Sequence, residues 1–183
     1  MKYKTAKSSL DIYFVTSVIT DHTLIFTNQR MASIPLESLA WFRDQNIWKI
    51  YAFCLMPNHV HFILRQLNSS PVDKYLGQFH SYTGHEIVRF LKTAKQLKSL
   101  DVLKTGAKRI KTKREHLVWQ DCLVRIIETE DVLLQEMEYI HNNPISKKWA
   151  LATSRSNYPY SSACFYDNGK NPIIEIDDVR ELI

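Results

Sequence analysis

The chain has 183 residues, of which 45% are hydrophobic, and carries a formal net charge of +5 at pH 7. A chain of this length suits one domain, here 1–183, that buries about two-thirds of its unfolded surface. The start, Met1–Ser9, lacks the apolar centre of a signal peptide, and no apolar run is long enough to span a bilayer. These features count against secretion and membrane insertion, so we expect a cytoplasmic protein. The three scattered cysteines count against a disulfide scaffold or a Cys-rich zinc site.

The first third of the chain predicts a strand, a helix and two further strands. Leu10–Ile19 has strand character, and Ile34–Asp44 has the apolar spacing of an amphipathic helix. Two runs that follow, Trp48–Met56 and His59–Gln66, are rich in β-branched and aromatic residues, which favours strands over helices. Only a Pro-Asn dipeptide, which is typical of a turn, separates them, so the two strands should be joined by a very short connection.

The rest of the chain is predicted to be mainly helical. Val72–Leu100 indicates a helix interrupted near Gly84, and Leu117–Ile127 contains a further strand. Glu130–Asn142 lacks Gly and Pro and has apolar residues at i, i+4 and i+7, so it should form a helix with one face in a core. From about residue 157 we expect an ordered tail that packs back on the domain.

His59 and His61 are candidate metal ligands. Alternate residues of a strand point to one face and lie about 6 to 7 Å apart along the chain, so both imidazoles can reach one cation. Val60 then points the other way, into the core. The alternative is an ordinary pair of surface or core histidines, because His-x-His often arises by chance. His80 and His85 are a poorer pair, about 140° apart on a helix, and we interpret them as structural or DNA-contact residues.

Tyr139 is a candidate nucleophile on the last of the predicted helices. It stands about 100° from Ile140 around the helix, so its ring should lie at the edge of the buried face, with its hydroxyl toward solvent or substrate. Asn143, four residues on, would place a side-chain amide beside the phenol if the helix persists. Pro144 disfavours helical geometry at the residue before it, so the helix should end near residue 142 or 143. The alternative is that Tyr139 is only a packing residue, as is usual on an amphipathic helix.

The positive charge is unevenly placed, with a cluster of cations around Gly106. Such a cluster is a candidate phosphate-contact segment of a nucleic-acid-binding protein. The charge pattern alone fits a solvated basic loop equally well. The cationic residues of this basic segment are Lys104, Lys108, Arg109, Lys111, Lys113 and Arg114.

Several motifs follow one another at suitable spacing, and such an ordered set is more specific than His-x-His alone. The motifs are Tyr13–Thr16, Tyr51–His61, Trp119–Gln120, Tyr139–Pro144 and Tyr158–Ala163. Together they resemble those of the HUH single-tyrosine (IS200-like) transposases, where HUH denotes two histidines around a hydrophobic residue. Within this superfamily the REP-associated tyrosine transposases look most similar, and the resemblance covers most of the chain.

The resemblance implies an α+β fold with a ferredoxin-like, RRM-like core, in which helices pack on an antiparallel sheet that carries His59 and His61. It implies an enzyme that binds single-stranded DNA hairpins of palindromic repeats and cleaves and rejoins strands through a 5′-phosphotyrosine link to Tyr139. A divalent ion, Mg²⁺ or Mn²⁺, is expected at the two histidines, with Asn143 as a third ligand. Many insertion-sequence relatives have glutamine at that place, and His141 is a substitute candidate here. Relatives act as monomers or homodimers, and both states stay open.

Three other functions stay open. A classical mobile insertion-sequence transposase is the nearest. A domesticated regulator would bind DNA hairpins without cleaving them. The intact His59, His61 and Tyr139 count against that regulator, whereas the segment Asp121–Arg125, which departs from the family pattern, leaves it open. A metal hydrolase unrelated to DNA would have to keep its activity in a Tyr139→Phe variant.

Overall fold

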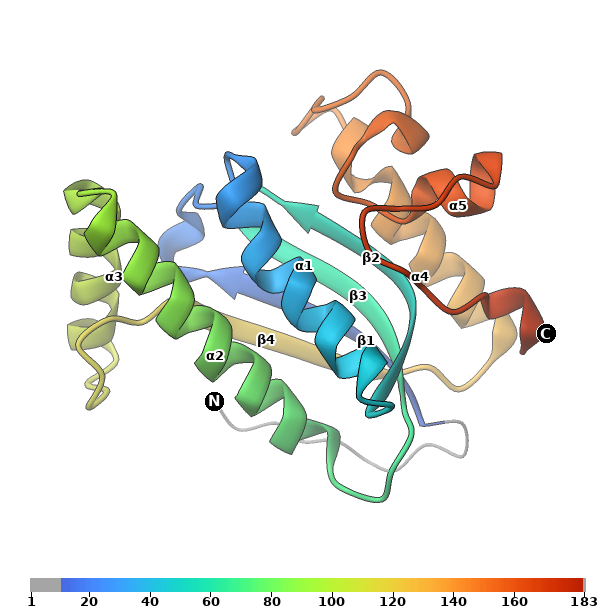
Figure 1. Ribbon diagram of the computed structural model, residues 1–183, viewed down its shortest axis with the longest axis horizontal. Helices are drawn as coiled ribbons and strands as arrows, with labels where there is room; N and C mark the ends of the chain where they lie inside the picture. Colours follow the sequence, from blue (N-terminus) through green and yellow to red (C-terminus); the bar gives the residue numbers. More distant parts are fainter. Residues whose placement is uncertain (1–10, 183) are drawn as a thin grey trace.

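The computed structural model describes residues 11–182, which build a four-stranded antiparallel sheet with helices packed on it (Figure 1). The sheet order is β2-β3-β1-β4, with β1 (Ile12–Ile19), β2 (Trp48–Met56), β3 (His59–Gln66) and β4 (Trp119–Ile126). Helical segments lie between β1 and β2 and between β3 and β4, which together with this order gives a ferredoxin-like arrangement. The predicted α+β class is therefore confirmed.

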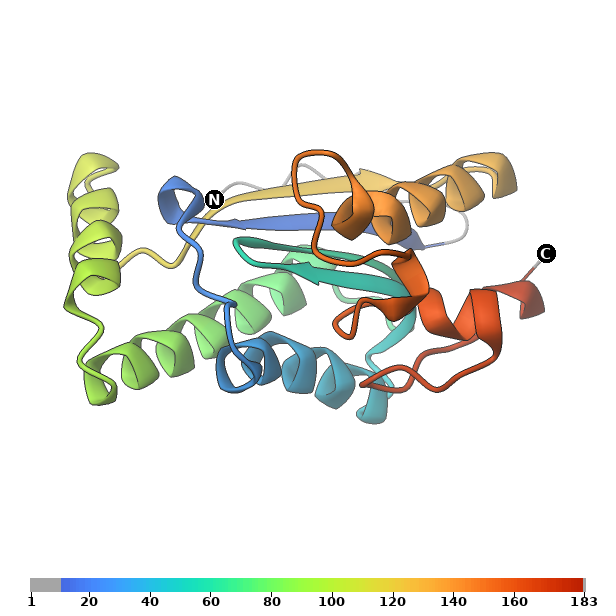
Figure 2. The ribbon, with the colours of Figure 1, turned by 90° about the horizontal axis from the view of Figure 1, so that it is seen from above.

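The helices form separate layers on the two faces of the sheet. Figure 2 shows α1 and α2 below the sheet and α4 above it, while α3 stands at the end where β1 finishes and β4 begins. The helices are α1 (Gln29–Asp44), α2 (Val72–Thr93), α3 (Leu97–Arg109), α4 (Glu130–Asn142) and α5 (Ala163–Asn168). Short 3-10 turns are η1 (Thr20–His22), η2 (Asn143–Ile145), η3 (Arg155–Asn157) and η4 (Val179–Glu181).

Successive side chains of a strand point to opposite faces of the sheet, so the interior is divided into two cores. Tyr13 and Val15 of β1 lie in the core beneath α1 and α2, whereas Ile12 and Phe14 lie in the core beneath α4. The apolar stripe that α4 contributes to this second core is Leu133, Met137 and Ile140. The predicted i, i+4, i+7 pattern thus fixes which side of α4 faces the sheet.

The chain after α4 wraps round the edge strand β2. The Leu55 backbone N–H donates to the Tyr160 carbonyl at 2.8 Å, and the Asp177 N–H donates to the Ile50 carbonyl at 2.7 Å. These bonds satisfy backbone groups that an edge strand would otherwise expose. They also anchor the C-terminal part of the chain to the strand beside β3.

Helix α1 begins at Gln29, so the predicted start at Ile34 was wrong. Asn28 caps the helix, because its side-chain oxygen accepts from the Met31 backbone N–H at 3.0 Å. Pro35 lies inside the helix rather than at its first position. The signal for the start of the helix is therefore Asn28.

The helix predicted over Val72–Leu100 is two helices, but its interruption lies at 94–96 and not near Gly84. Lys95, with φ of 52°, adopts the left-handed conformation that ends α2. Gly84 instead lies inside α2 against the start of β4, where an added Cβ would stand 3.7 Å from the Val118 side chain. A Cβ would make only an ordinary contact there, so Gly84 marks neither a break nor a close approach of the backbone.

The remaining predicted strand boundaries and those of the helix after them agree with the structure to within two residues. Leu10, the predicted start of the first strand, and Met1–Ser9 lie outside the described residues. The strand predicted over Leu117–Ile127 is β4, and the helix predicted over Glu130–Asn142 is α4 with the same bounds. Within residues 11–182 there is no helix whose length and apolar character would allow it to cross a membrane.

Candidate active site

Strand β3 begins at His59, and its pleat places His59 and His61 on the face of the sheet that carries α4. The two ring centroids lie 4.6 Å apart, with the rings nearly perpendicular at 82°. His61 is buried, at 3% exposure, while His59 is partly exposed. The structure thus brings the two predicted ligands together, with the more exposed one at the strand start.

Both imidazoles are held through Nδ1, which leaves each Nε2 available. The Nδ1 of His61 lies 2.7 Å from Thr16 Oγ1, across the β1–β3 pairing, and the Nδ1 of His59 lies 2.6 Å from Asn58 Oδ1. The Asn58 amide nitrogen donates to the His22 carbonyl, so its oxygen faces His59 and His59 donates from Nδ1. Such outer hydrogen bonds fix the tautomer and the ring orientation of metal-binding histidines.

Burial keeps the two histidines uncharged. It lowers the pKa of His59 to about 4, with a further contribution from the nearby Lys148 charge. It lowers the pKa of His61 to about 3, and the charges of His59 and Arg125 act in the same direction. Both rings are therefore neutral at pH 7, which is the form that binds a metal ion.

Tyr139 lies on α4 with its ring over the histidine pair. Its ring centroid is 5.4 Å from that of His61 and 6.1 Å from that of Phe14, and the residue is 52% exposed. Ile140, one position on, is fully buried. The hydroxyl-bearing ring thus stands at the edge of the buried stripe, accessible to a substrate.

Asn143 joins the pair, whereas His141 does not. The Asn143 side-chain amide lies 3.4 Å from His61 Nε2. The nitrogen and oxygen of such an amide are assigned from their partners, so a cation at Nε2 would meet the oxygen after a flip. His141 is buried and its Nε2 lies 2.9 Å from Ser162 Oγ. His141 follows Tyr139 by two residues, which is a rotation of about 200° around the helix, so the His141 side chain points away from the Tyr139 side.

The donor set fits a divalent ion. Two neutral imidazole nitrogens and one amide oxygen would supply three protein ligands and leave positions open for a phosphate oxygen and water. Within residues 11–182 no cluster of three or more His, Cys, Asp or Glu side chains could hold a metal ion. The candidate site therefore depends on an amide as the third donor.

Two groups of residues beside the site were not predicted from the sequence. Trp149 has its ring 5.8 Å from that of His59, and the Lys148 ammonium lies 5.6 Å from the Trp149 ring centroid. Arg125 of β4 lies over the Phe14 ring at 5.0 Å and pairs with Glu136 of α4. No periodic pattern predicts these residues. Lys148 and Trp149 come after Pro144, and Arg125 belongs to Asp121–Arg125, the segment that departs from the family pattern.

The predicted DNA-contact residues belong to α3 and the turn that follows it, and Figure 2 shows α3 at the other end of the molecule from α4. The segment is not simply a loop, because Lys104, Lys108 and Arg109 belong to the helix. The Arg109 guanidinium donates to Asp21 at 2.6 Å and to Gln120 at 3.3 Å, so it is tied to the fold. Arg109 is itself exposed, and the other exposed cations on the same segment are Lys104, Lys108, Lys111, Lys113 and Arg114.

The sequence model of the family described as "Transposase IS200 like" matches residues 6–103. A search of curated proteins gave no match. Among solved structures, the chain is similar to a REP-associated tyrosine transposase bound to a REP hairpin, with 15% identity, a TM-score of 0.62, and coverage of 98% of this chain and 93% of that chain. A putative transposase from Deinococcus radiodurans is also 15% identical, with a TM-score of 0.49 and coverage of 78% and 97%.

The family match spans more than half of the chain and includes the hairpin that carries His59 and His61. The likeness to the REP-associated transposase extends over almost the whole chain, and at this identity it shows the fold, including α4. Both findings agree with the resemblance that the sequence motifs indicated. The chain belongs to the IS200-like transposase family.

Proposed function

We propose that this transposase binds a single-stranded DNA hairpin and cleaves and rejoins a strand through a 5′-phosphotyrosine link to Tyr139. The observation that carries the proposal is the exposed Tyr139 ring, 5.4 Å from the ring of His61. A hydrolase that activates water has no need of a phenol beside its metal ligands. A transesterase needs a nucleophile of the protein at that place.

His59, His61 and Asn143 would hold the ion, either Mg²⁺ or Mn²⁺. The bound ion would stabilise the negative charge that develops on the phosphate oxygens. The histidines remain neutral through burial and are kept in orientation by Thr16 and Asn58. This preorganisation supports the assignment, because ligands that are already fixed lose little freedom on binding.

The proposed reaction exchanges one phosphodiester bond for another. The Tyr139 oxygen bonds to phosphorus, the bond from phosphorus to the 3′ oxygen breaks, and the phenolic proton is transferred so that a 3′-hydroxyl is released. The DNA on the other side of the break stays on the protein through its 5′ phosphate. Because no water is consumed, a second 3′-hydroxyl can attack the phosphotyrosine and restore a continuous strand.

DNA binding would draw on cations at two places. Arg125 lies beside Phe14, whose ring neighbours that of Tyr139, so it would contact a bound phosphate by sharing its ion pair with Glu136. The exposed part of the basic segment, which includes Lys108, Lys111, Lys113 and Arg114, would contact phosphates farther along the DNA. Arg109 would chiefly hold that segment in place through Asp21.

The direct test is covalent capture of DNA. Hairpin oligonucleotides from the flanks of the gene, labelled at the 5′ or the 3′ end, are incubated with Mn²⁺, Mg²⁺ or EDTA and separated on denaturing gels. Wild type is compared with Tyr139→Phe. Tyr82→Phe is a matched control, because Tyr82 is similarly exposed, at 59%, and lies on α2.

We expect an adduct that retains the 3′-labelled fragment, requires a divalent ion, survives in Tyr82→Phe and disappears in Tyr139→Phe. Tight hairpin binding without an adduct would instead favour a non-cleaving regulator. Cleavage that persists in Tyr139→Phe would point to hydrolysis by activated water. Failure to bind any hairpin would contradict the DNA substrate itself.

A further inference from the structure

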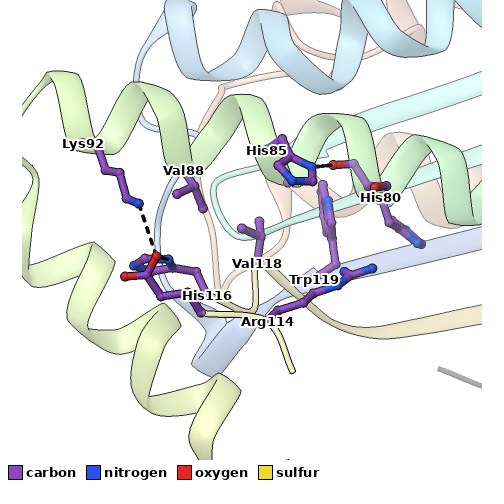
Figure 3. A pocket seen from close by; sticks show the side chains of 11 residues that line it. His80, His85, Val88, Lys92, Arg114, His116, Val118 and Trp119 are labelled. Atoms are coloured by element: carbon purple, nitrogen blue, oxygen red, sulfur yellow. Dashed lines mark hydrogen bonds and ion pairs between the residues drawn. The ribbon is translucent and has the colours of Figure 1, made fainter. Parts of the chain in front are cut away.

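A cavity of about 280 Å³ lies between α2 and the segment 114–119 that leads into β4. Figure 3 shows side chains of both elements converging on it. It is on the side of the sheet opposite Tyr139, because Ser17 of β1 bonds to His80 of this cavity, whereas its neighbour Thr16 bonds to His61. The cavity is therefore distinct from the candidate active site.

One wall of the cavity is apolar and has room for a planar or ring-shaped group. Val88, Val118 and Trp119 line it, and the Trp119 indole is fixed by a 2.9 Å hydrogen bond from its Nε1 to Thr83. Gly84 forms part of the same wall without a side chain. An added Cβ there would meet the Val118 side chain at 3.7 Å, an ordinary contact, so a methyl group fits, and a longer side chain would extend against Val118 and Trp119.

Charged side chains complete the lining of the cavity. Lys92 pairs with Glu115 at 3.4 Å, and both side chains are more than half exposed. Arg114 also lines the cavity, and within residues 11–182 no salt bridge joins its guanidinium to a carboxylate. The charged groups at the cavity therefore leave one net positive charge, on Arg114.

His85 adds a polar group with a defined orientation. Its Nδ1 lies 2.8 Å from the Ser81 carbonyl, so Nδ1 donates and Nε2 is left for another partner. Figure 3 shows this contact along α2, at the cavity. A charged fork, a ring nitrogen and an apolar wall are thus present in one site.

We propose that this cavity binds one nucleotide of a DNA strand, with the phosphodiester at Arg114 and the sugar and base against the apolar wall. The inference rests on the proposed function. One net positive charge matches the single negative charge of a phosphodiester. Arg114 is also the last cation of the basic segment. A DNA strand that contacts the exposed cations of this segment in order therefore reaches the cavity.

The position of β4 determines how one DNA strand could contact both the cavity and the candidate active site. Within the described part of the chain, β4 is an edge strand paired only with β1. Trp119, its first residue, faces the cavity side, and Arg125, near its other end, faces the Phe14 side. A DNA strand bound at both places passes round this edge.

The test measures affinity separately from cleavage. All variants carry Tyr139→Phe and are studied in EDTA with a fluorescently labelled hairpin that has single-stranded flanks. Gly84→Leu fills the cavity, and Gly77→Leu is its control on the same helix, since a Cβ at Gly77 meets nothing within 4 Å. Arg114→Gln removes the cation while leaving the interior unchanged, and Lys170→Gln removes an exposed charge near α5.

We expect Gly84→Leu and Arg114→Gln to weaken hairpin binding about tenfold, the range of one stacked base or one charge-assisted contact. Arg114→Gln should also reduce the salt slope by about 0.7. Affinities equal to those of the two controls would overturn the cavity proposal while leaving DNA binding intact. If the Tyr139→Phe parent itself bound no hairpin, both proposals would fail.

A second arm identifies the source of the phosphate. Thymidine 5′-monophosphate and inorganic phosphate are titrated while the His85 and His116 ring signals are followed by NMR. We expect weak, millimolar binding that is lost in Arg114→Gln. Tight binding of the free nucleotide, together with hairpin affinity that is insensitive to Gly84→Leu, would overturn the assignment in favour of a free-nucleotide site.

Discussion

Thr16 and His61 are joined across strands β1 and β3 by a contact of 2.7 Å between Oγ1 and Nδ1. The residues are directly paired in the sheet, so the register of the strands creates this contact. It commits Nδ1 of a buried ring to a hydroxyl and turns Nε2 toward Asn143. The sheet itself thus holds the ring in the orientation that its proposed role as a metal ligand requires.

Replacing Thr16 by valine should weaken metal binding while the fold persists. Valine keeps the branched shape but cannot hold the imidazole, so we expect about a 10- to 100-fold loss of Mn²⁺ affinity. Calorimetric titration with Mn²⁺ measures this loss. Thr27→Val, at an exposed position whose side chain makes no hydrogen bond within residues 11–182, should bind Mn²⁺ like wild type. Equal affinities of the two variants would contradict the role given to Thr16.

Metal removal should abolish the covalent adduct, and Mn²⁺ should restore it at lower concentration than Mg²⁺. The reason is that two of the three protein donors are imidazole nitrogens, whereas Mg²⁺ prefers oxygen ligands. Titrating each ion into EDTA-treated protein and measuring the initial rate of adduct formation tests the order. His61→Ala should give no adduct above the EDTA background with either ion. An adduct that forms at full rate in EDTA would exclude the proposed site.

Much of this site was predictable from local pattern. The strand character around His59 and His61, and the apolar stripe of α4 that leaves Tyr139 at its edge, follow from the periodicity of strands and helices. The same reasoning predicted the bounds of α4. What it needs is only the order of residues along one element.

The unpredicted features are those that depend on residues distant in sequence. The contact of Thr16 with His61 depends on strand register, and Gly84 could be understood only after Val118 was placed against it. The position of Trp149 beside His59 depends on how the chain turns after α4. A single sequence carries no periodic signal for any of these.

The buried histidines should make the protein sensitive to acid. Burial lowers the pKa of His141 to about 4 and that of His80 to about 3, whereas an unfolded histidine titrates near 6.5. Below pH 6.5 the unfolded chain therefore binds protons that the folded chain does not. The resulting stability is fully present above pH 6.5 and falls as the pH decreases toward 4, by up to about 1.4 kcal/mol per pH unit for each histidine.

Urea unfolding at pH 7.5, 6.5, 5.5 and 5.0 measures this loss. His141→Gln keeps a group that can hydrogen-bond Ser162 but cannot be protonated in this range. Its free energy of unfolding should therefore decrease less steeply with falling pH than that of wild type. The comparison uses slopes, so a constant packing loss in the variant does not affect it. Parallel slopes would show that His141 does not contribute.

Ala150 is expected to be a site where glycine stabilises the protein. Its φ is 45°, in the left-handed region that side chains disfavour, and its N–H donates to the Ser146 carbonyl in the turn after η2. Ala150→Gly should raise the free energy of unfolding by about 0.5 to 1 kcal/mol. Ala40→Gly, inside α1, should lower it by about 1 kcal/mol. Thermal and urea unfolding of the two variants therefore should move in opposite directions, and a shared decrease would refute the assignment of strain to Ala150.

Contacts between the basic segment and DNA should make the affinity for the hairpin depend on salt concentration. Lys111 and Lys113 are exposed on the turn after α3, so each phosphate they neutralise contributes about 0.7 to the slope of log affinity against log salt. Lys111→Gln and Lys113→Gln should each reduce the slope by that amount in hairpin binding by Tyr139→Phe protein. Arg109→Gln should change it less, because Arg109 already pairs with Asp21. Losing a cation that contacts a phosphate reduces the number of counterions released on binding, and so reduces the slope. Equal slopes in all three variants and in the parent would therefore show that the basic segment does not contact the DNA.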